Sequence, residues 1–381
     1  MKLYNKIKDF GKIGVGDILG NVFSASFWFY LASQIEPAEY GEIHWFLGIA
    51  SIFSSIALLS TVNTITVYTA KKIPIQSTLN IISLIASAAS SLIVIVVFPS
   101  FYTIDVGVIL IAYVINALAV GHLLGNKQYA KYSKFTILQK FLTLLLGITF
   151  LYFFGYEAII FALALSYIFH FKRVFDIFKE SKINFGLLKL RIGFITNNYL
   201  VSILAVSAGQ IDKIVIAPIL GFAILGNYSL ALQAINVSML IPSIFYKYLL
   251  PEEASGSDTK KIKIIVVLFS ILLAICSFII FPIIITEFFP KFTEAINAIK
   301  IMSIVIIPTT VALIMESEFL GQEKSRIVII GSLIYLVSLV IGMITLGSLF
   351  GVEGIAYSLI LATILKTTLY ATFRNRIRTN T

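Results

Sequence analysis

The sequence predicts an all-α polytopic membrane protein, with about twelve transmembrane helices in two pseudo-symmetric six-helix lobes around a central cavity. Three observations support this fold class: the composition, a nearly unbroken series of apolar segments, and an internal repeat. Of the 381 residues, 59% are hydrophobic and only 13% are charged, whereas a soluble domain is about 25% charged. A soluble globule of this length needs far more polar surface, so the composition excludes the soluble, disordered and fibrous classes.

The apolar segments have the length of membrane-spanning helices, which need about 20 mostly apolar residues. They lie at 13–34, 42–66, 78–98, 106–125, 135–153, 157–172, 194–220, 223–248, 262–284, 295–317, 327–349 and 352–373. Runs such as 264–281 do not alternate in polarity, as the strands of a membrane barrel do. The segments are therefore predicted to be helices.

Lysine and arginine are concentrated in every second loop, as expected for cytoplasmic loops. With the N-terminus inside, the inner loops hold clusters such as Lys71–Lys72 and Arg374–Arg378, while the outer loops hold only Lys291 and Lys300. This pattern predicts a multi-pass protein of the cell (plasma) membrane with both termini cytoplasmic. It also accounts for most of the net charge of +10. No basic, aromatic-rich stretch lies outside the membrane ends, so no nucleic-acid partner is expected.

The two halves of the sequence resemble each other. The recurring motifs, in pairs, are Phe154-Gly155-Tyr156-Glu157 with Phe350-Gly351-Val352-Glu353, Leu124-Gly125-Asn126 with Leu320-Gly321-Gln322, and Tyr40-Gly41-Glu42 with Leu225-Gly226-Asn227. Each half contains six helices, so both have the same orientation, a plan known from transporters that bind substrate between parallel repeats. The predicted domains are an N-terminal lobe at 1–172, a cytoplasmic linker at 173–193 and a C-terminal lobe at 194–381.

Polar residues recur at helical spacing on the first two helices of each half. Such residues are costly in hydrocarbon and usually face a bundle interior or a cavity. We predict that a substrate cavity is lined by Asp17, Asn21, Ser24, Ser51, Ser55, Asn197, Asn198, Asp212, Lys213, Gln233, Asn236 and Lys247. The alternative is that the small residues allow close helix packing and the amides form interhelical hydrogen bonds.

Three titratable residues are candidates for ion coupling: Asp17, His44 and Asp212. Each has an alternative explanation. Asp17 lies near the start of a helix, where a carboxylate favours the helix dipole; His44 lies beside Trp45 near the outer interface; and Lys213 can neutralise Asp212 locally. Lys213 and Lys247 are also candidates for contact with an anionic cargo.

The sequence offers no arrangement of residues for catalysis. No carboxylate pair, metal-ligand cluster or nucleophile–base arrangement suited to an enzyme is found, and the sequence has no Walker A motif. Glu252-Glu253, Glu316 and Glu318 fall at cytoplasmic helix ends, where a carboxylate is expected to be solvated. We therefore expect a protein that is not an enzyme and that has no cofactor and no metal site.

The chain resembles the polysaccharide transporters, or oligosaccharide-lipid flippases, of the multidrug/oligosaccharidyl-lipid/polysaccharide exporter superfamily. The segments that carry this resemblance are Leu31–Glu42, Gln210–Ile216, Leu225–Ala231 and Leu320–Gln322. The resemblance implies a two-lobed twelve-helix fold that moves a lipid-linked oligosaccharide of the polyprenyl phosphate or pyrophosphate type by alternating access. Membrane lipid is a further partner, and H⁺ or Na⁺ is the candidate coupling ion.

Two other functions remain open. A cation-coupled drug or metabolite antiporter of the same superfamily needs an acidic cavity, which Asp17 and Asp212 could supply. A membrane glycosyltransferase or polymerase needs an aqueous catalytic domain or a long outer loop with catalytic residues. The longest connections here have about 20 residues, so this enzymatic alternative is the weaker of the two.

Overall fold

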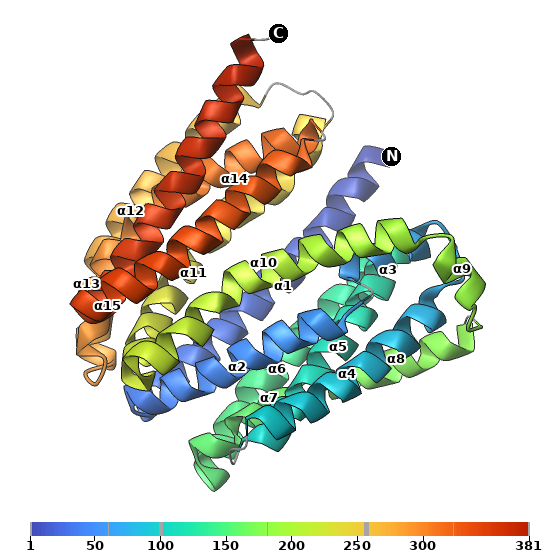
Figure 1. Cartoon of the computed structure of the whole chain (residues 1–381), viewed down its shortest axis with the longest axis horizontal. Coiled ribbons are helices and arrows are strands. Elements are labelled where there is room, and N and C mark those ends of the chain that lie inside the picture. The colour runs from blue at the N-terminus through green and yellow to red at the C-terminus, as the bar shows by residue number, and fades with distance from the viewer. Residues whose placement is uncertain are drawn as a thin grey trace. The chain divides into compact units, whose positions relative to one another are not determined.

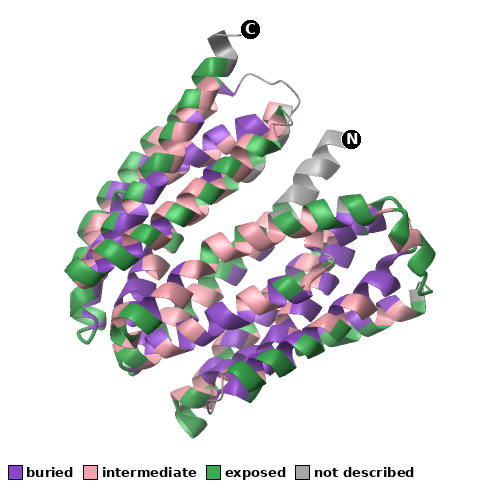
Figure 2. Ribbon diagram, viewed as in Figure 1, coloured by how far each residue is buried: buried purple, intermediate pink, exposed green. Residues whose placement is uncertain are grey.

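The computed structural model describes residues 2–59, 61–98, 102–180, 182–254, 259–322 and 324–379. Every regular element within these ranges is a helix (Figure 1). Exposed residues occur along the helices of both units (Figure 2), and many of them have large apolar side chains. Extensive exposed apolar surface marks contact with a membrane, which agrees with the predicted fold class.

Most helices follow the predicted segments, but α1 begins at Lys2 and not at residue 13. Asp17 therefore lies in the middle of α1, and the alternative that it lies near a helix start is wrong. The first eleven elements are α1 (Lys2–Gln34), α2 (Pro37–Ala57), α3 (Val62–Ala70), α4 (Gln76–Val97), α5 (Thr103–Gly125), α6 (Tyr129–Phe154), η1 (Tyr156–Ala158), α7 (Ile159–Leu165), α8 (Ile168–Glu180), α9 (Phe185–Lys189) and α10 (Ile192–Leu220). The remaining five are α11 (Phe222–Ala254), α12 (Lys260–Phe288), α13 (Thr293–Ser303), α14 (Ile306–Gly321) and α15 (Ser325–Thr379). All twelve predicted segments lie mainly on helical residues.

Eight helical stretches among the described residues are long and apolar enough to cross a membrane, or ten when each of two bent pairs counts as one span. The pairs are α2 with α3, bent by 41°, and α13 with α14, bent by 46°. The sequence predicts each pair as a single helix. In the first pair, Thr61 starts a new helix by accepting the N–H of Thr64 on its side chain. In the second, Pro308 has no N–H for the carbonyl of Ile304.

Two glycines of the repeated motif explain why this motif recurs. Gly155 ends α6 with φ +80° and ψ −178°, and Gly351 interrupts α15 with φ +58° and ψ −133°. Both conformations belong to a region that only glycine adopts without strain. The same joint therefore separates the last two helices of each half, and α15 consists of two helices that meet at Gly351.

Packing divides the chain into two compact units. Unit 1 comprises residues 1–31 and 46–210, and unit 2 comprises residues 32–45 and 211–381. These boundaries differ from those of the predicted lobes, which follow the sequence repeat. The first part of α10 packs in unit 1, where the Tyr199 hydroxyl donates to the carbonyl of Ile56 over 2.7 Å. The start of α2 packs in unit 2, where the rings of Tyr40 and Phe292 lie 5.7 Å apart.

Within unit 2, the N-terminal ends of α2 and α11 cross at two glycines. A Cβ on Gly41 would overlap the carbonyl oxygen of Phe222, and a Cβ on Gly226 would overlap that of Pro37. The contact is reciprocal because Gly41 corresponds to Gly226, and Pro37 to Phe222, in the sequence repeat. The repeated glycines are therefore required for close backbone approach.

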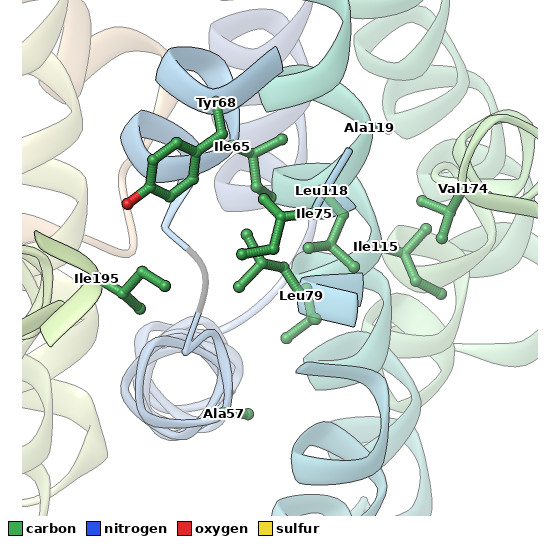
Figure 3. Close-up of a cluster of buried hydrophobic side chains, with 11 residues drawn as sticks. Ala57, Ile65, Tyr68, Ile75, Leu79, Ile115, Leu118, Ala119, Val174 and Ile195 are labelled. Carbon is green, nitrogen blue, oxygen red and sulfur yellow. The ribbon is translucent and has the colours of Figure 1, made fainter. Parts of the chain in front are cut away.

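The core of unit 1 surrounds the break between α2 and α3. One cluster of this core contains the buried residues Ala57, Ile65, Tyr68, Ile75, Leu79, Val114, Ile115, Leu118, Ala119, Val174 and Ile195 (Figure 3). Val174 belongs to α8, which continues to Glu180 instead of ending at 172 as predicted, and Ile195 belongs to α10. Residues around the predicted linker thus help to build the core of this unit.

Candidate functional site

Unit 1 contains a neutral polar pocket of about 410 Å³. Its polar lining comes from α2, the start of α3, α5 and α10, and comprises Ser51, Ser54, Ser55, Thr61, Asn63, Tyr113, Ser202 and Gln210. None of its thirteen described lining residues is charged. The pocket lies beside the break after Ala57, where the last turns of α2 carry the small side chains of Ser51, Ser54 and Ser55. Hydroxyl and amide groups can both donate and accept hydrogen bonds.

Of the predicted site residues in unit 1, Ser51 and Ser55 line this pocket, and Asp17 does not. Asp17 accepts a hydrogen bond from the hydroxyl of Tyr132 on α6 over 2.8 Å. Asn21 is exposed and Ser24 is half-buried on α1, outside the lining. Helical spacing therefore places the three α1 residues on one face, but the structure does not join them to the serines of α2 in one pocket.

Unit 2 contains a second pocket of about 280 Å³, formed by α11, α14 and α15. Its polar residues are Asn236, Thr309, Glu316, Tyr335, Thr363 and Lys366. The Lys366 ammonium lies 3.1 Å from the Glu316 carboxylate, and their side chains are only 19% and 18% exposed. Lys366 also lies over the rings of Tyr335 and Tyr370, 5.9 and 5.5 Å from their centroids, in the geometry of a cation–π contact. The prediction that Glu316 is a solvated charge is wrong.

Asp212 and Lys213 form a buried pair in unit 2. Their side chains are 7% and 11% exposed, and the Lys213 ammonium lies 3.8 Å from the Asp212 carboxylate. The carboxylate accepts the N–H of Lys213 and the hydroxyl of Tyr228, both over 2.8 Å. The geometry therefore favours neutralisation of Asp212 by Lys213 over a role of Asp212 in ion coupling. His44 is buried in the same unit, with its ring 4.6 Å from that of Tyr40.

The other predicted residues are more scattered. On α10, Asn197 is exposed and Asn198 is half-buried. Gln233 is half-buried on α11, three residues before Asn236, and does not line the second pocket. Lys247 belongs to α11, but its side chain lies outside the described residues.

Two polar clusters were not predicted from the sequence. In unit 1, Gln139 donates to Thr143 and to Ser166, each over 3.0 Å, and all three side chains are buried. The spacing of Gln139 and Thr143 on one helix face was the available signal. In unit 2, the Glu318 carboxylate is 2.6 Å from Lys263 and 2.7 Å from Arg374. Glu253 and Glu318 were predicted to be solvated, but their side chains are 13% and 8% exposed, so this prediction is also wrong.

The described residues contain no group of three or more His, Cys, Asp or Glu side chains that could hold a metal ion. Each unit has its own candidate site, the neutral pocket in unit 1 and the pocket with the Glu316–Lys366 pair in unit 2. This arrangement can bind an uncharged polar ligand by hydrogen bonds.

Comparison with solved structures identifies the fold. No protein-family model matches the sequence, and no curated protein matches it either. The structure is similar to that of the lipid II flippase MurJ in an inward closed conformation, with a TM-score of 0.77 and 11% identity over 95% of this chain and 87% of that chain. It is also similar to a multidrug resistance MATE family transporter of the MOP superfamily in an inward-facing conformation, with a TM-score of 0.73 and 13% identity over 96% and 95% of the two chains.

A third similar structure is a MATE protein in complex with MaD5, with a TM-score of 0.68 and 14% identity over 98% and 96% of the two chains. At these identities the likeness concerns the fold. The predicted fold class is confirmed: this chain is a multi-pass membrane protein with the fold that MurJ and the MATE transporters share.

Proposed function

We propose that the protein is a flippase that moves a lipid-linked oligosaccharide across the cell membrane by alternating access. The single observation that carries this proposal is the neutral lining of the unit 1 pocket, which offers hydroxyl and amide groups and no charge. Sugars present many hydroxyl groups, and a few well-placed polar side chains orient such a ligand. The likeness to the lipid II flippase MurJ supports the same class of cargo.

The alternative is a cation-coupled drug or metabolite antiporter, which the likeness to MATE transporters supports. A site for a cationic drug needs an acidic group that is free to meet the ligand. The carboxylates of Asp17, Asp212 and Glu316 each hold a hydrogen bond or an ion pair within their own unit. These partners favour the flippase over the antiporter.

The substrate is proposed to contact the predicted polar residues, with Ser51, Ser55 and Asn236 as the members that line pockets. The cargo is a glycan on polyprenyl phosphate or pyrophosphate, and H⁺ or Na⁺ is the proposed coupling ion. The protein is proposed to lie in the cell membrane with both termini cytoplasmic and to have no enzymatic activity of its own.

The proposal is tested by reconstituting the purified full-length protein into liposomes. A fluorescent disaccharide linked to polyprenyl pyrophosphate reports flipping through its accessibility to a membrane-impermeant quencher. Efflux of a cationic dye under an H⁺ or Na⁺ gradient is measured in parallel. We expect flipping of the glycolipid and no dye efflux. Dye efflux without flipping contradicts the proposal and establishes the antiporter.

The pocket is tested by Asn63→Ala and Ser202→Ala, with Thr149→Ala as the matched control. Asn63 and Ser202 line the unit 1 pocket, whereas the exposed Thr149 hydroxyl donates to its own helix on α6. Loss of one hydrogen bond to the sugar is expected to slow flipping about threefold to tenfold. The control is expected to flip at the original rate. Equal flipping rates in all three variants would show that this pocket does not bind the sugar.

A further inference from the structure

Unit 2 carries an open groove of about 420 Å³ that is separate from the pocket described above. Its wall is formed by α12, α14 and the last part of α15. The nine described lining residues are Lys260, Lys263, Ile264, Val267, Leu268, Val311, Ile314, Met315 and Arg374. Three of these residues are basic, six are apolar and none is acidic. Ile264 and Leu268 are 60% and 61% exposed, so the apolar wall is open to the surroundings.

The basic and apolar residues are separated along the helix. On α12, the lining residues from Lys260 to Leu268 recur every three or four positions and so share one face. The two lysines lie on the first turn, and the apolar residues follow toward the middle of α12. At about 1.5 Å per residue, this stretch is about 12 Å long, which fits within one leaflet of a hydrocarbon core about 30 Å thick.

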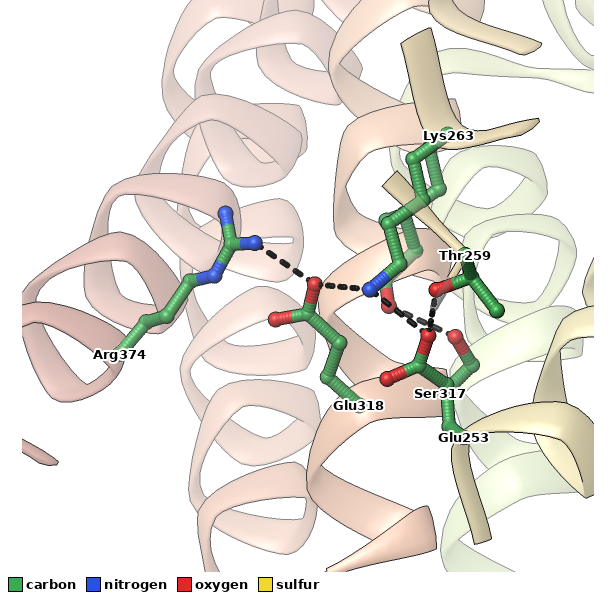
Figure 4. Close-up of polar contacts among 7 residues, drawn as sticks. Glu253, Thr259, Lys263, Ser317, Glu318 and Arg374 are labelled. Atoms are coloured by element: carbon green, nitrogen blue, oxygen red, sulfur yellow. Dashed lines mark hydrogen bonds and ion pairs between the residues drawn. The ribbon is translucent and has the colours of Figure 1, made fainter. Parts of the chain in front are cut away.

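The basic residues are fixed in place by a network of carboxylates outside the lining (Figure 4). Glu318 on α14 bridges Lys263 of α12 and Arg374 of α15 with the same oxygen, at 2.6 and 2.7 Å. Lys263 is also 2.7 Å from Glu253, which accepts a hydrogen bond from Thr259. Four helices, α11, α12, α14 and α15, thus hold these two cations and their two carboxylates at one end of the groove. Lys260 adds a further positive charge at the same end.

The start of α12 adds to the positive potential at this end. Thr259 is its N-cap residue, but its side chain makes no capping hydrogen bond and instead donates to Glu253. The N–H groups of the first helical turn carry a partial positive charge that favours an anion. Glu253 and Glu318 offset the charges of Lys263 and Arg374. The net positive charge at this end therefore comes from Lys260 and from the helix end, and it suits a phosphate group that is attached to an apolar chain.

We propose that this groove binds an anionic phospholipid. Its phosphate lies against Lys260, Lys263 and Arg374, and one acyl chain lies along Ile264 and Leu268. Basic pockets between membrane helices bind anionic headgroups by this combination of charge and apolar contact. The distribution of Lys and Arg predicts that this end of unit 2 faces the cytoplasm, so the lipid belongs to the inner leaflet.

The test measures lipid binding to the purified full-length protein by native mass spectrometry, with phosphatidylglycerol and phosphatidylcholine of identical acyl chains. We expect preferential binding of phosphatidylglycerol. Lys260→Ala should weaken it about fivefold, as expected for loss of one lysine near an anionic lipid. The matched control is Lys261→Ala, which removes the same charge from a neighbouring residue outside the lining.

A second variant tests the apolar wall without altering any charge. Ile264→Trp fills the groove and should lower phosphatidylglycerol binding, whereas Ile275→Trp, at an exposed position of α12 outside the lining, should not. Equal weakening by Lys260→Ala and Lys261→Ala, or unchanged binding in Ile264→Trp, would overturn the proposal. Displacement of phosphatidylglycerol by glycerol phosphate would show that a free phosphate compound is the ligand. Stronger competition by polyprenyl phosphate than by phosphatidylglycerol would show that the ligand is the cargo lipid. Either result would contradict the proposed phospholipid.

Discussion

At the scale of single residues, the buried charged side chains of unit 2 form ion pairs with one another. We expect Asp212→Ala to destabilise the protein because it leaves the Lys213 ammonium buried without its carboxylate. Removing one member of such a pair costs about 3 kcal/mol or more. Thermal unfolding of the purified protein in detergent measures the effect. Asn236→Ala is the control, because Asn236 is exposed on α11. Equal unfolding temperatures for the two variants would contradict this interpretation.

Glu316 and Lys366 provide a second test at this scale. Glu316→Gln and Lys366→Met each leave one charge without its partner in a site that is less than one-fifth exposed. We expect each single variant to unfold at a lower temperature than the double variant, because the double variant leaves neither charge behind. The double-mutant cycle should give a coupling energy of about 0.5–3 kcal/mol. Additive effects would show that the two residues do not interact.

These pairs also explain how much of the site could be predicted from the sequence. Helical spacing identified Asp17, Ser51, Ser55, Asp212 and Asn236 as polar positions, because spacing is a property of one helix. It did not identify the contacts of Asp17 with Tyr132 or of Glu316 with Lys366, whose members are separated by 115 and 50 residues. Such pairing depends on how helices pack against one another.

At the scale of elements, glycine joints determine where helices end. Ala substituted for Gly351 or Gly155 must adopt a backbone conformation that costs about 1–3 kcal/mol. We therefore expect Gly351→Ala and Gly155→Ala to lower the unfolding temperature. Gly193→Ala is the control, since Gly193 is helical and a Cβ there meets nothing within 4 Å. A decrease of the same size in the control would contradict the role of positive φ.

The sequence predicted the position of nearly every helix but not the bends. Apolar segment length gave bounds within a few residues, as for α4 and α12, because a span is set by membrane thickness. The breaks within 42–66 and 295–317 interrupt segments that stay apolar throughout. Composition does not register such breaks, since they depend on a capping threonine in one pair and on a proline in the other.

At the scale of the whole molecule, the repeat and the packing units give different divisions of the chain. The repeat places α10 with the second half of the sequence, whereas its first nineteen residues, 192–210, pack in unit 1. Residues 32–45 conversely pack in unit 2. A sequence repeat shows which helices are similar in sequence, whereas the packing units show which helices contact one another. The division into lobes therefore stays a prediction, while the recurrence of Gly155 and Gly351 has a structural reason.

The distribution of Lys and Arg over the whole chain predicts which loops face the cytoplasm. Cys276 is the single cysteine, so Cys276→Ser provides a background for cysteine labelling in intact cells. Lys291→Cys tests an outer loop, where Lys291 is 44% exposed and pairs with Glu36. Lys72→Cys tests an inner loop at an exposed position after α3.

We expect a membrane-impermeant maleimide to label Lys291→Cys in intact cells and Lys72→Cys only after the membrane is permeabilised. The physical reason is the cost of moving clustered positive charges across the bilayer, which keeps Lys71 and Lys72 inside while the sparsely charged outer loops cross. Labelling of Lys72→Cys in intact cells would show that the orientation is opposite to the predicted one. It would also move the proposed phospholipid groove to the outer leaflet, because Lys260 and Arg374 lie on the same predicted side as Lys72.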